Sequence, residues 1–153
     1  MTSASPDGDR FVVTRVVKWG ECDFAGIAYT PRYADWCVEA VEQIYARVGL
    51  SWRHLHESMG LGSPFVRLGV DFKSPVLLGD ELLQRVSVVK IGTSSIEWCV
   101  VGEVLGRRVF VASLVNVIIR KTTGTSCPVP QQLRDALLAQ PLTGDQQQKT
   151  DDQ

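Results

Sequence analysis

The sequence changes its hydrophobic period near residue 31, and this change constrains the fold more than any other feature. Beyond Pro31, apolar side chains recur at three- and four-residue steps, the period of an amphipathic helix: Tyr33, Trp36, Cys37, Ala40, Ile44 and Val48. Thr30 is a good N-cap, Pro31 suits the first helical position, and Gly49 is a typical helix end. We therefore expect one long helix over residues 31–48.

Five other stretches are rich in β-branched and aromatic residues and are predicted to be strands: residues 10–18, 65–72, 81–91, 95–104 and 108–120. Turn-like breaks separate the last four, and short breaks favour antiparallel neighbours. The order of elements predicts an α+β fold in which a five-stranded antiparallel sheet wraps around one long helix. Shorter helices are expected over residues 51–59 and 131–139.

The length of 153 residues fits a single domain, for which we expect boundaries at residues 10 and 140. The polar segments 1–9 and 141–153 are expected to be disordered. Sixteen Lys and Arg against seventeen Asp and Glu give a net charge of −1, which predicts neither a nucleic acid nor a membrane as partner. The first residues do not read as a signal peptide and no apolar run approaches membrane-spanning length, so we expect a soluble cytoplasmic protein.

The chain has four cysteines and only two histidines, and the cysteines show no CxxC pair. A metal site built from His and Cys would be poorly supplied, so no metal is expected. We interpret the cysteines as reduced, mostly buried, small apolar residues.

The stretch WGECDFAGIAY, residues 19–29, lies between the first predicted strand and the long helix. Its Asp23 has two interpretations, because an aspartate before Phe-Ala-Gly can simply shape an Asx-turn or can act as a reacting carboxylate. Cys22 beside it could be a nucleophile with His54 or His56 as base. A structural Cys22 is favoured, because the sequence offers no third group to orient such a pair.

Several motifs together resemble the hotdog-fold acyl-CoA thioesterases, and specifically the 4-hydroxybenzoyl-CoA thioesterase family. The resemblance extends over residues 10–121 and is carried by GECDFAGI at 20–27, PRY at 31–33, GSP at 62–64, VDFKSP at 70–75 and GD at 79–80. The first of these motifs is fairly specific, and the later ones are weaker.

The resemblance implies hydrolysis of an acyl-CoA thioester with two catalytic groups. The carboxylate of Asp23 would attack the thioester or activate a water, and the backbone N–H of Thr30 would polarise the carbonyl. Both roles are physically sensible, because the carbonyl oxygen gains negative charge during attack and a helix N-terminus presents unpaired N–H groups. Coenzyme A leaves as a thiolate and is part of the substrate, so neither a strong general acid nor a separate cofactor is expected.

The resemblance also implies a homodimer joined edge to edge through its sheets, with sites between the subunits, and a dimer of dimers beyond it. Residues expected to contact the acyl group are Tyr29, Trp36, Val38 and Ser63. Lys90, Thr93 and Ser94 are expected along the pantetheine arm, with Arg120 and Lys121 as further basic candidates. Structural alternatives stay open: Trp36 as a core residue, Ser63 as a turn hydroxyl, and Lys90, Thr93 and Ser94 as a solvated turn.

Two departures from the family pattern bear on the substrate. Phe24 stands where the family usually has proline, which changes the rigidity of the loop and adds an aromatic surface. Val38 stands where 4-hydroxybenzoyl enzymes carry a carboxylate toward the ring hydroxyl, and valine accepts no hydrogen bond. Burying an unpaired phenol costs about 1–3 kcal/mol, so we expect an acyl group that is apolar at that end, such as benzoyl or another aromatic or medium-length acyl group.

Two other functions remain in contention on the same fold. A non-catalytic acyl-CoA sensor is the first, and the intact Asp23 disfavours it because a sensor could dispense with that carboxylate. A dehydratase is the second, and it is disfavoured because its usual catalytic histidine has no counterpart at the motif.

Overall fold

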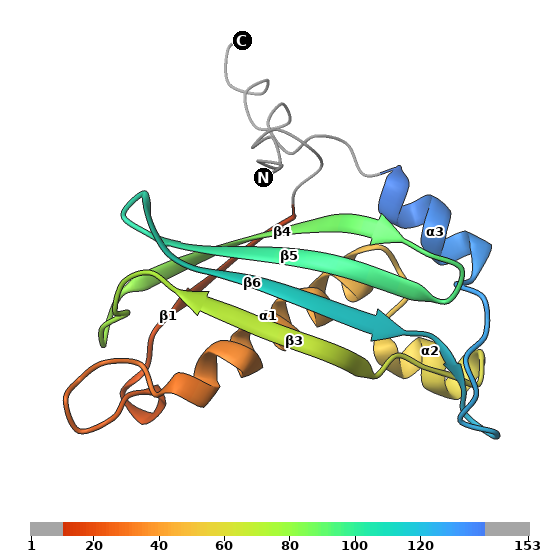
Figure 1. Ribbon diagram of the computed structural model, residues 1–153, viewed down its shortest axis with the longest axis horizontal. Coiled ribbons are helices and arrows are strands. Elements are labelled where there is room, and N and C mark those ends of the chain that lie inside the picture. Colours follow the sequence, from red (N-terminus) through yellow and green to blue (C-terminus); the bar gives the residue numbers. More distant parts are fainter. Residues whose placement is uncertain (1–10, 140–153) are drawn as a thin grey trace, which may run out of the picture.

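A five-stranded antiparallel sheet forms the frame of the protein, as the computed structural model of residues 11–139 shows (Figure 1). Its strands lie in the order β1-β4-β5-β6-β3. Their bounds are β1 Phe11–Val16, β3 Phe65–Phe72, β4 Glu81–Ile91, β5 Ser95–Val104 and β6 Arg107–Val117. Each neighbouring pair is antiparallel, so the predicted α+β class and the predicted five-stranded sheet are confirmed.

Helix α1, Thr30–Arg47, packs along one face of this sheet (Figure 1). Its buried residues follow the predicted stripe: Tyr33, Trp36, Cys37, Ala40, Val41, Ile44 and Tyr45. The predicted start is one residue late, because Tyr29 occupies the N-cap and Thr30 is already helical. Tyr29 is held in an extended conformation, and its N–H donates to Glu21 O at 2.8 Å, so tertiary pairing rather than a side-chain cap sets where the helix begins.

Short elements complete the chain. Helix α2, Trp52–Ser58, is capped by Ser51 Oγ, which accepts the His54 N–H at 3.2 Å. The predicted strand 108–120 is divided in two, because Ile118 leaves the main sheet and donates its N–H to Ser94 O. The remaining short elements are η1 Trp19–Glu21, β2 Leu61–Gly62, β7 Ile119–Arg120, which pairs with β2, and α3 Gln131–Leu138.

The core lies between α1 and the sheet and contains a small polar network. Trp98 Nε1–H donates to Asn116 Oδ1 at 2.7 Å, and Asn116 Nδ2 donates to Tyr45 Oη at 2.7 Å and to Ser63 Oγ. Asn116 is fully buried and satisfied, so the network ties β5, β6 and α1 together without an orphaned amide.

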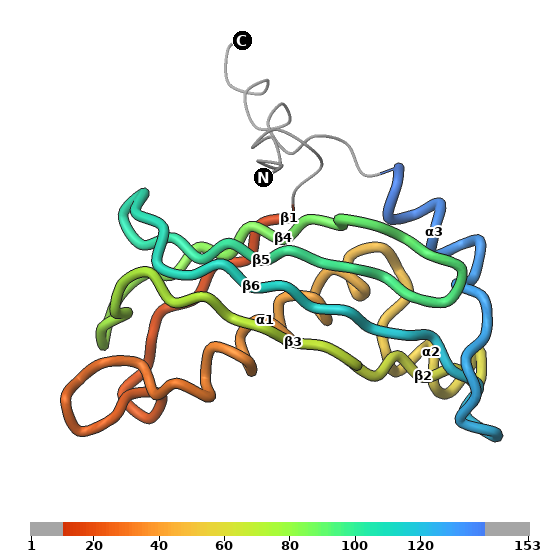
Figure 2. Tube along the Cα trace, in the orientation of Figure 1, coloured from red at the N-terminus to blue at the C-terminus, as the bar shows by residue number. Residues whose placement is uncertain are grey.

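The molecule has two distinct ends (Figure 2). One end, the hairpin end, holds η1, the start of α1 and the connections from β3 to β4 and from β5 to β6. The other, the α2 end, holds α2, α3 and the turn from β4 to β5. No helix within residues 11–139 is both long and apolar enough to cross a membrane. The predicted disordered segments lie outside the described residues.

Candidate active site

Asp23 lies at the base of a tight hairpin between η1 and α1. Cys22 and Ala28 form an antiparallel bridge, and the Asp23 N–H donates to Ile27 O at 2.9 Å. Gly26, at φ +79°, closes the turn by donating its N–H to Asp23 O at 3.0 Å, in a conformation that glycine adopts readily. The hairpin therefore fixes the backbone that carries the carboxylate.

The Asp23 carboxylate uses one oxygen for the turn and leaves the other open. Oδ1 accepts the Ala25 N–H at 2.8 Å, which confirms the Asx-turn interpretation. Oδ2 accepts no hydrogen bond from residues 11–139, and the side chain is partly exposed. The same carboxylate can therefore shape the turn and still present an oxygen to a ligand.

The start of α1 lies at the closing end of the same loop. Ala28 N–H donates to Val76 O and Tyr29 N–H donates to Glu21 O, each at 2.8 Å. Thr30 follows as the first helical residue, and its N–H donates to no group within the described part of the chain. This geometry leaves a backbone donor available beside the Asp23 hairpin, at the positive end of the helix dipole.

A charged cluster that the sequence analysis did not identify lies beneath this loop. Glu21 Oε2 accepts the Lys18 N–H at 2.8 Å, and Oε1 accepts Trp36 Nε1–H at 3.1 Å and a hydrogen bond from Arg15. The Arg15 guanidinium also donates to Glu39 Oε2 at 2.8 Å and lies 5.0 Å from the centre of the Trp36 ring. Glu21 and Glu39 are thus both paired with Arg15.

The electrostatics of this cluster favour ionised Glu21. Burial acts to raise the pKa of Glu21, but hydrogen bonds from the Lys18 N–H and the Trp36 indole, with the charge of Arg15, hold it below its ordinary value. Glu21 lies three residues beyond Lys18, close enough for its side chain to accept the Lys18 N–H, but the sequence lacks the Ser or Thr that would mark a capping box. The contacts to Arg15 and Trp36 depend on tertiary folding.

Other predicted residues at this end differ in exposure. Trp36 is 1% exposed, so its core interpretation holds within the chain. Tyr29 and Phe24 are exposed at 54% and 106%, and both are free to meet a ligand or a second protein chain. Val38 is half-buried on α1 and packs against the core.

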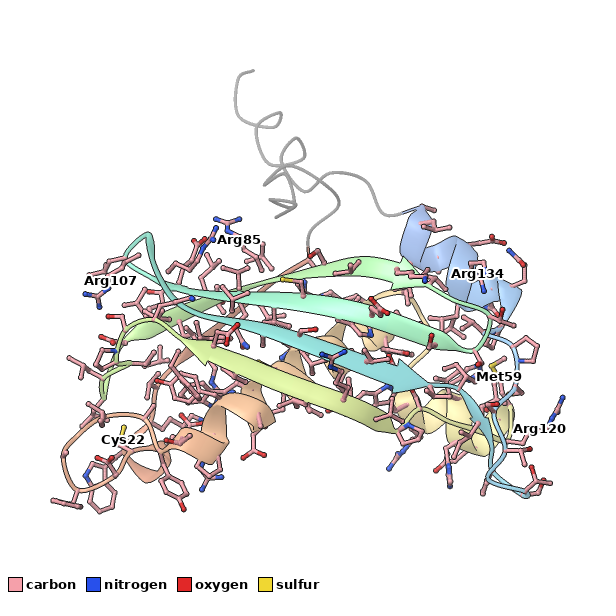
Figure 3. The ribbon with its side chains drawn as sticks, in the orientation of Figure 1. Cys22, Met59, Arg85, Arg107, Arg120 and Arg134 are labelled. Atoms are coloured by element: carbon pink, nitrogen blue, oxygen red, sulfur yellow. The ribbon has the colours of Figure 1, made fainter. Side chains whose placement is uncertain are left out.

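The alternative nucleophile Cys22 does not meet its proposed base. Cys22 lies at the hairpin end, whereas α2, which carries both histidines, lies at the opposite end beside Met59 (Figure 3). Cys22 Sγ donates to Lys18 O at 3.6 Å. Burial, with the nearby charges of Asp23 and Glu21, raises the pKa of the Cys22 thiol, which disfavours the thiolate that a nucleophile requires.

The remaining predicted site residues lie at the α2 end. Ser63 belongs to the buried network and lines a pocket of about 310 Å³ with Trp52, Leu55, His56, Leu61 and Gly62. Thr93 O and Ser94 O accept backbone N–H groups from Val129 and Ile118, which anchor the β4–β5 turn. Lys90 is exposed near that turn, and Arg120 is exposed at the same end (Figure 3). Within one chain, the structure therefore does not bring these residues to Asp23.

The structure contains no disulfide among residues 11–139, and Cys37 and Cys127 are buried. Burial raises the pKa of Cys37 to about 12, so this thiol stays protonated. Within residues 11–139, no cluster of His, Cys, Asp and Glu side chains could hold a metal ion.

Comparisons with known proteins found similar sequences and similar structures. The family model of the thioesterase-like superfamily matches residues 17–137. A 1,4-dihydroxy-2-naphthoyl-CoA hydrolase from Synechococcus sp. (strain CC9605) is 29% identical over 125 residues, which cover 77% of this chain and 83% of the relative.

Two solved structures are also similar. A thioesterase-superfamily protein from Jannaschia sp. CCS1 is 34% identical, with a TM-score of 0.80, and the match covers 87% of this chain and 94% of that chain. A gentisyl-coenzyme A thioesterase is 27% identical, with a TM-score of 0.74, and the match covers 83% of this chain and 98% of that chain.

Proposed function

Because the chain belongs to the thioesterase-like superfamily and has its hotdog fold, we propose that this thioester hydrolase cleaves an aromatic acyl-CoA through Asp23 and the Thr30 N–H. One observation carries the proposal. Asp23 has one oxygen anchored by Ala25 and the other open, on a hairpin that closes directly against the unpaired N–H at the start of α1. A carboxylate and a backbone donor converging on one carbonyl are what thioester hydrolysis needs.

The reaction begins with attack on the thioester carbonyl. The thioester oxygen accepts the Thr30 N–H, and the open oxygen of Asp23 attacks the carbonyl carbon or removes a proton from an attacking water. The hydrogen bond from the Thr30 N–H and the helix dipole stabilise the tetrahedral oxyanion. One such donor lowers the transition-state free energy by about 3 kcal/mol. The C–S bond then breaks, and coenzyme A leaves as a thiolate. If Asp23 is the nucleophile, water hydrolyses the resulting anhydride and regenerates the carboxylate.

Val38 and the names of the relatives support an acyl group without a para hydroxyl. In 1,4-dihydroxy-2-naphthoyl and in gentisyl, which is 2,5-dihydroxybenzoyl, one hydroxyl is ortho to the carbonyl and none is para to it. The family position that would bind a para hydroxyl is occupied here by Val38, which accepts no hydrogen bond. The proposal therefore keeps benzoyl-CoA and adds 2,5-dihydroxyaroyl-CoA esters.

A homodimer formed through β3 would bring the residues of the α2 end of one copy to Asp23 of the other. One edge of β3 pairs with β6, and the strand exposes Val66, Leu68 and Phe72 at 63%, 39% and 51%. Antiparallel pairing with β3 of a second copy extends the sheet and sets the hairpin end of one copy beside the α2 end of the other. Ser63, Lys90, Thr93 and Ser94 of the second copy then approach Asp23, and two such dimers form the expected tetramer.

Thiol release from a panel of CoA esters tests the proposal. The panel contains benzoyl, 2,5-dihydroxybenzoyl, 1,4-dihydroxy-2-naphthoyl and 4-hydroxybenzoyl esters, and we expect the last to be the poorest substrate. Asp23→Asn keeps the size of the side chain and removes its charge, so kcat should fall at least about 100-fold. Asp135→Asn on α3 is the matched control and should retain native kcat.

Three results would change the conclusion. Equal turnover by native protein and Asp23→Asn rules out the catalytic carboxylate. Binding of the CoA esters without hydrolysis favours the acyl-CoA sensor. A strong preference for 4-hydroxybenzoyl-CoA contradicts the assignment based on Val38.

Oxygen-18 labelling distinguishes the two roles proposed for Asp23. In a single turnover in H₂¹⁸O, a nucleophilic Asp23 incorporates label when its anhydride is hydrolysed at the aspartyl carbon, and a trapped acyl-enzyme supports the same role. A general base leaves Asp23 unlabelled, and all of the label appears in the acid product.

A further inference from the structure

Glu21 joins three elements around the proposed active site. Its carboxylate binds Arg15 of β1, the backbone N–H of Lys18 and the indole of Trp36 on α1. Its backbone takes part as well, because Glu21 N–H donates to Lys18 O at 3.0 Å and Glu21 O accepts the Tyr29 N–H at 2.8 Å. The residue is therefore a junction between the first strand, the hairpin and the long helix.

The junction closes the loop that carries both reacting groups. Asp23 lies two residues beyond Glu21, and Thr30 directly follows Tyr29, which Glu21 binds. A shift of Glu21 would move the Asp23 hairpin relative to the first turn of α1. A misplacement of about 1 Å can cost about 100-fold in rate, because attack requires aligned atoms.

The chemistry of the contacts calls for a carboxylate at this position. Three donors share the two oxygens of Glu21, and one donor is the positive guanidinium of Arg15. A glutamine offers a single acceptor oxygen, and its NH₂ group would face a donor instead of accepting from it. Arg15 is also held by Glu39 and by the face of Trp36, so its guanidinium is fixed in the position from which it donates to Glu21.

We infer that Glu21 is a positioning residue for the hydrolysis: through Arg15, Lys18 and Trp36 it fixes the Asp23 carboxylate relative to the Thr30 N–H. This inference rests on the proposed function. It assigns Glu21 no contact with the substrate, so its loss should change the rate of the chemical step and leave substrate binding nearly unchanged.

Steady-state kinetics of Glu21→Gln test the inference, measured well below the thermal midpoint of each variant on the best substrate of the panel. We expect kcat to fall about 10- to 100-fold, with KM within about twofold of native. A purely structural role would lower the thermal midpoint and leave kcat per folded molecule unchanged. Glu103→Gln is the matched control, because Glu103 also forms a half-buried pair with an arginine, Arg85, at 3.2 Å.

A second variant keeps the test decisive if Glu21→Gln does not fold. Arg15→Lys retains the positive charge but loses the planar fork that meets two carboxylates, and it should lower kcat by a smaller factor with KM unchanged. Native kcat in both variants, with Asp23→Asn inactive, overturns the inference and leaves the proposed function standing. Full activity of Asp23→Asn overturns both.

Discussion

Gly102 and Phe110 show how closely single residues are packed in this fold. They are register partners on β5 and β6, and the Phe110 ring covers the glycine. A Cβ atom at residue 102 would lie 2.2 Å from Phe110 Cε1. The ring has little room to retreat, because it is fully buried and meets Tyr33 edge-on at a centroid distance of 5.4 Å.

Gly102→Ala should therefore destabilise the protein although it adds a single methyl group. We expect a loss of about 1–3 kcal/mol in the free energy of unfolding, because overpacking forces the buried ring or the strand to shift. Urea denaturation measures the change. Gly20→Ala is the control, because an added Cβ there also meets nothing within 4 Å, and a similar loss in both variants would contradict the packing argument.

The lowered pKa of Glu21 predicts that the protein loses stability in acid. Its folded-state pKa lies below the ordinary value of 4.5, so ionised Glu21 stabilises the fold above about pH 4.5. The stabilisation is lost as the pH falls through the folded-state pKa, where the carboxylate is protonated. Glu21→Gln should thus be less stable than the native protein by about 1–3 kcal/mol at pH 7.

The difference in stability should narrow between pH 5 and pH 3. Urea denaturation of both proteins across this range measures it. A difference that stays constant to pH 3 would mean that the charge of Glu21 adds nothing to stability.

The two residues at the centre of the site differ in how far sequence could predict them. Asp23 is local: its turn needs only Ala25 and Gly26, so the motif predicted both the turn and its place before the helix. The cluster around Glu21 is not local. Arg15 and Trp36 meet Glu21 only after the strand and the helix have packed, and no spacing in the sequence encodes that contact.

At the scale of elements, long periodic segments were predictable and short paired ones were not. The predicted bounds of β3, β4 and β5 agree with the structure. In β4 and β5 burial alternates along the strand, as expected for a strand with one buried face, whereas β3 is mostly exposed and was predicted from its β-branched and aromatic residues. Strand β2 has only two residues, and its partner β7 lies far along the chain. The start of α1 was placed one residue late because the Tyr29–Glu21 hydrogen bond decides it.

Strand β3 is the edge strand through which two copies are proposed to pair. Leu68→Glu places a charge on the exposed edge strand, where charges oppose strand pairing. We expect the variant to sediment as a monomer and to lose hydrolysis, because the residues of the second copy no longer reach Asp23. Leu138→Glu on α3 is the control, since Leu138 is 63% exposed and lies away from this edge. A dimeric Leu68→Glu would show that the subunits join elsewhere.

The C-terminal helix α3 packs against the main core. Leu133 and Leu137 on α3 are 0% and 2% exposed. Arg134 Nη2 donates to Gly92 O at 2.7 Å, and Val129 N–H donates to Thr93 O at 2.8 Å. The helix thus packs on the core and holds the β4–β5 turn, where the pantetheine arm is proposed to pass. The predicted single domain over residues 10–140 can be tested by unfolding, because it requires α3 and the sheet to unfold together.

Leu133→Ala should therefore weaken the entire fold, not the last helix alone. Removing a fully buried leucine side chain costs about 2–5 kcal/mol through lost burial and the cavity left behind. In urea, helical circular dichroism and tryptophan fluorescence, to which the buried Trp36 and Trp98 contribute, should shift to lower midpoints together, because one core unfolds cooperatively. Leu138→Ala, which changes an exposed residue, should leave both midpoints near native. If circular dichroism reports an early partial transition while the fluorescence midpoint stays native, α3 unfolds as a separate unit and the single-domain prediction is wrong.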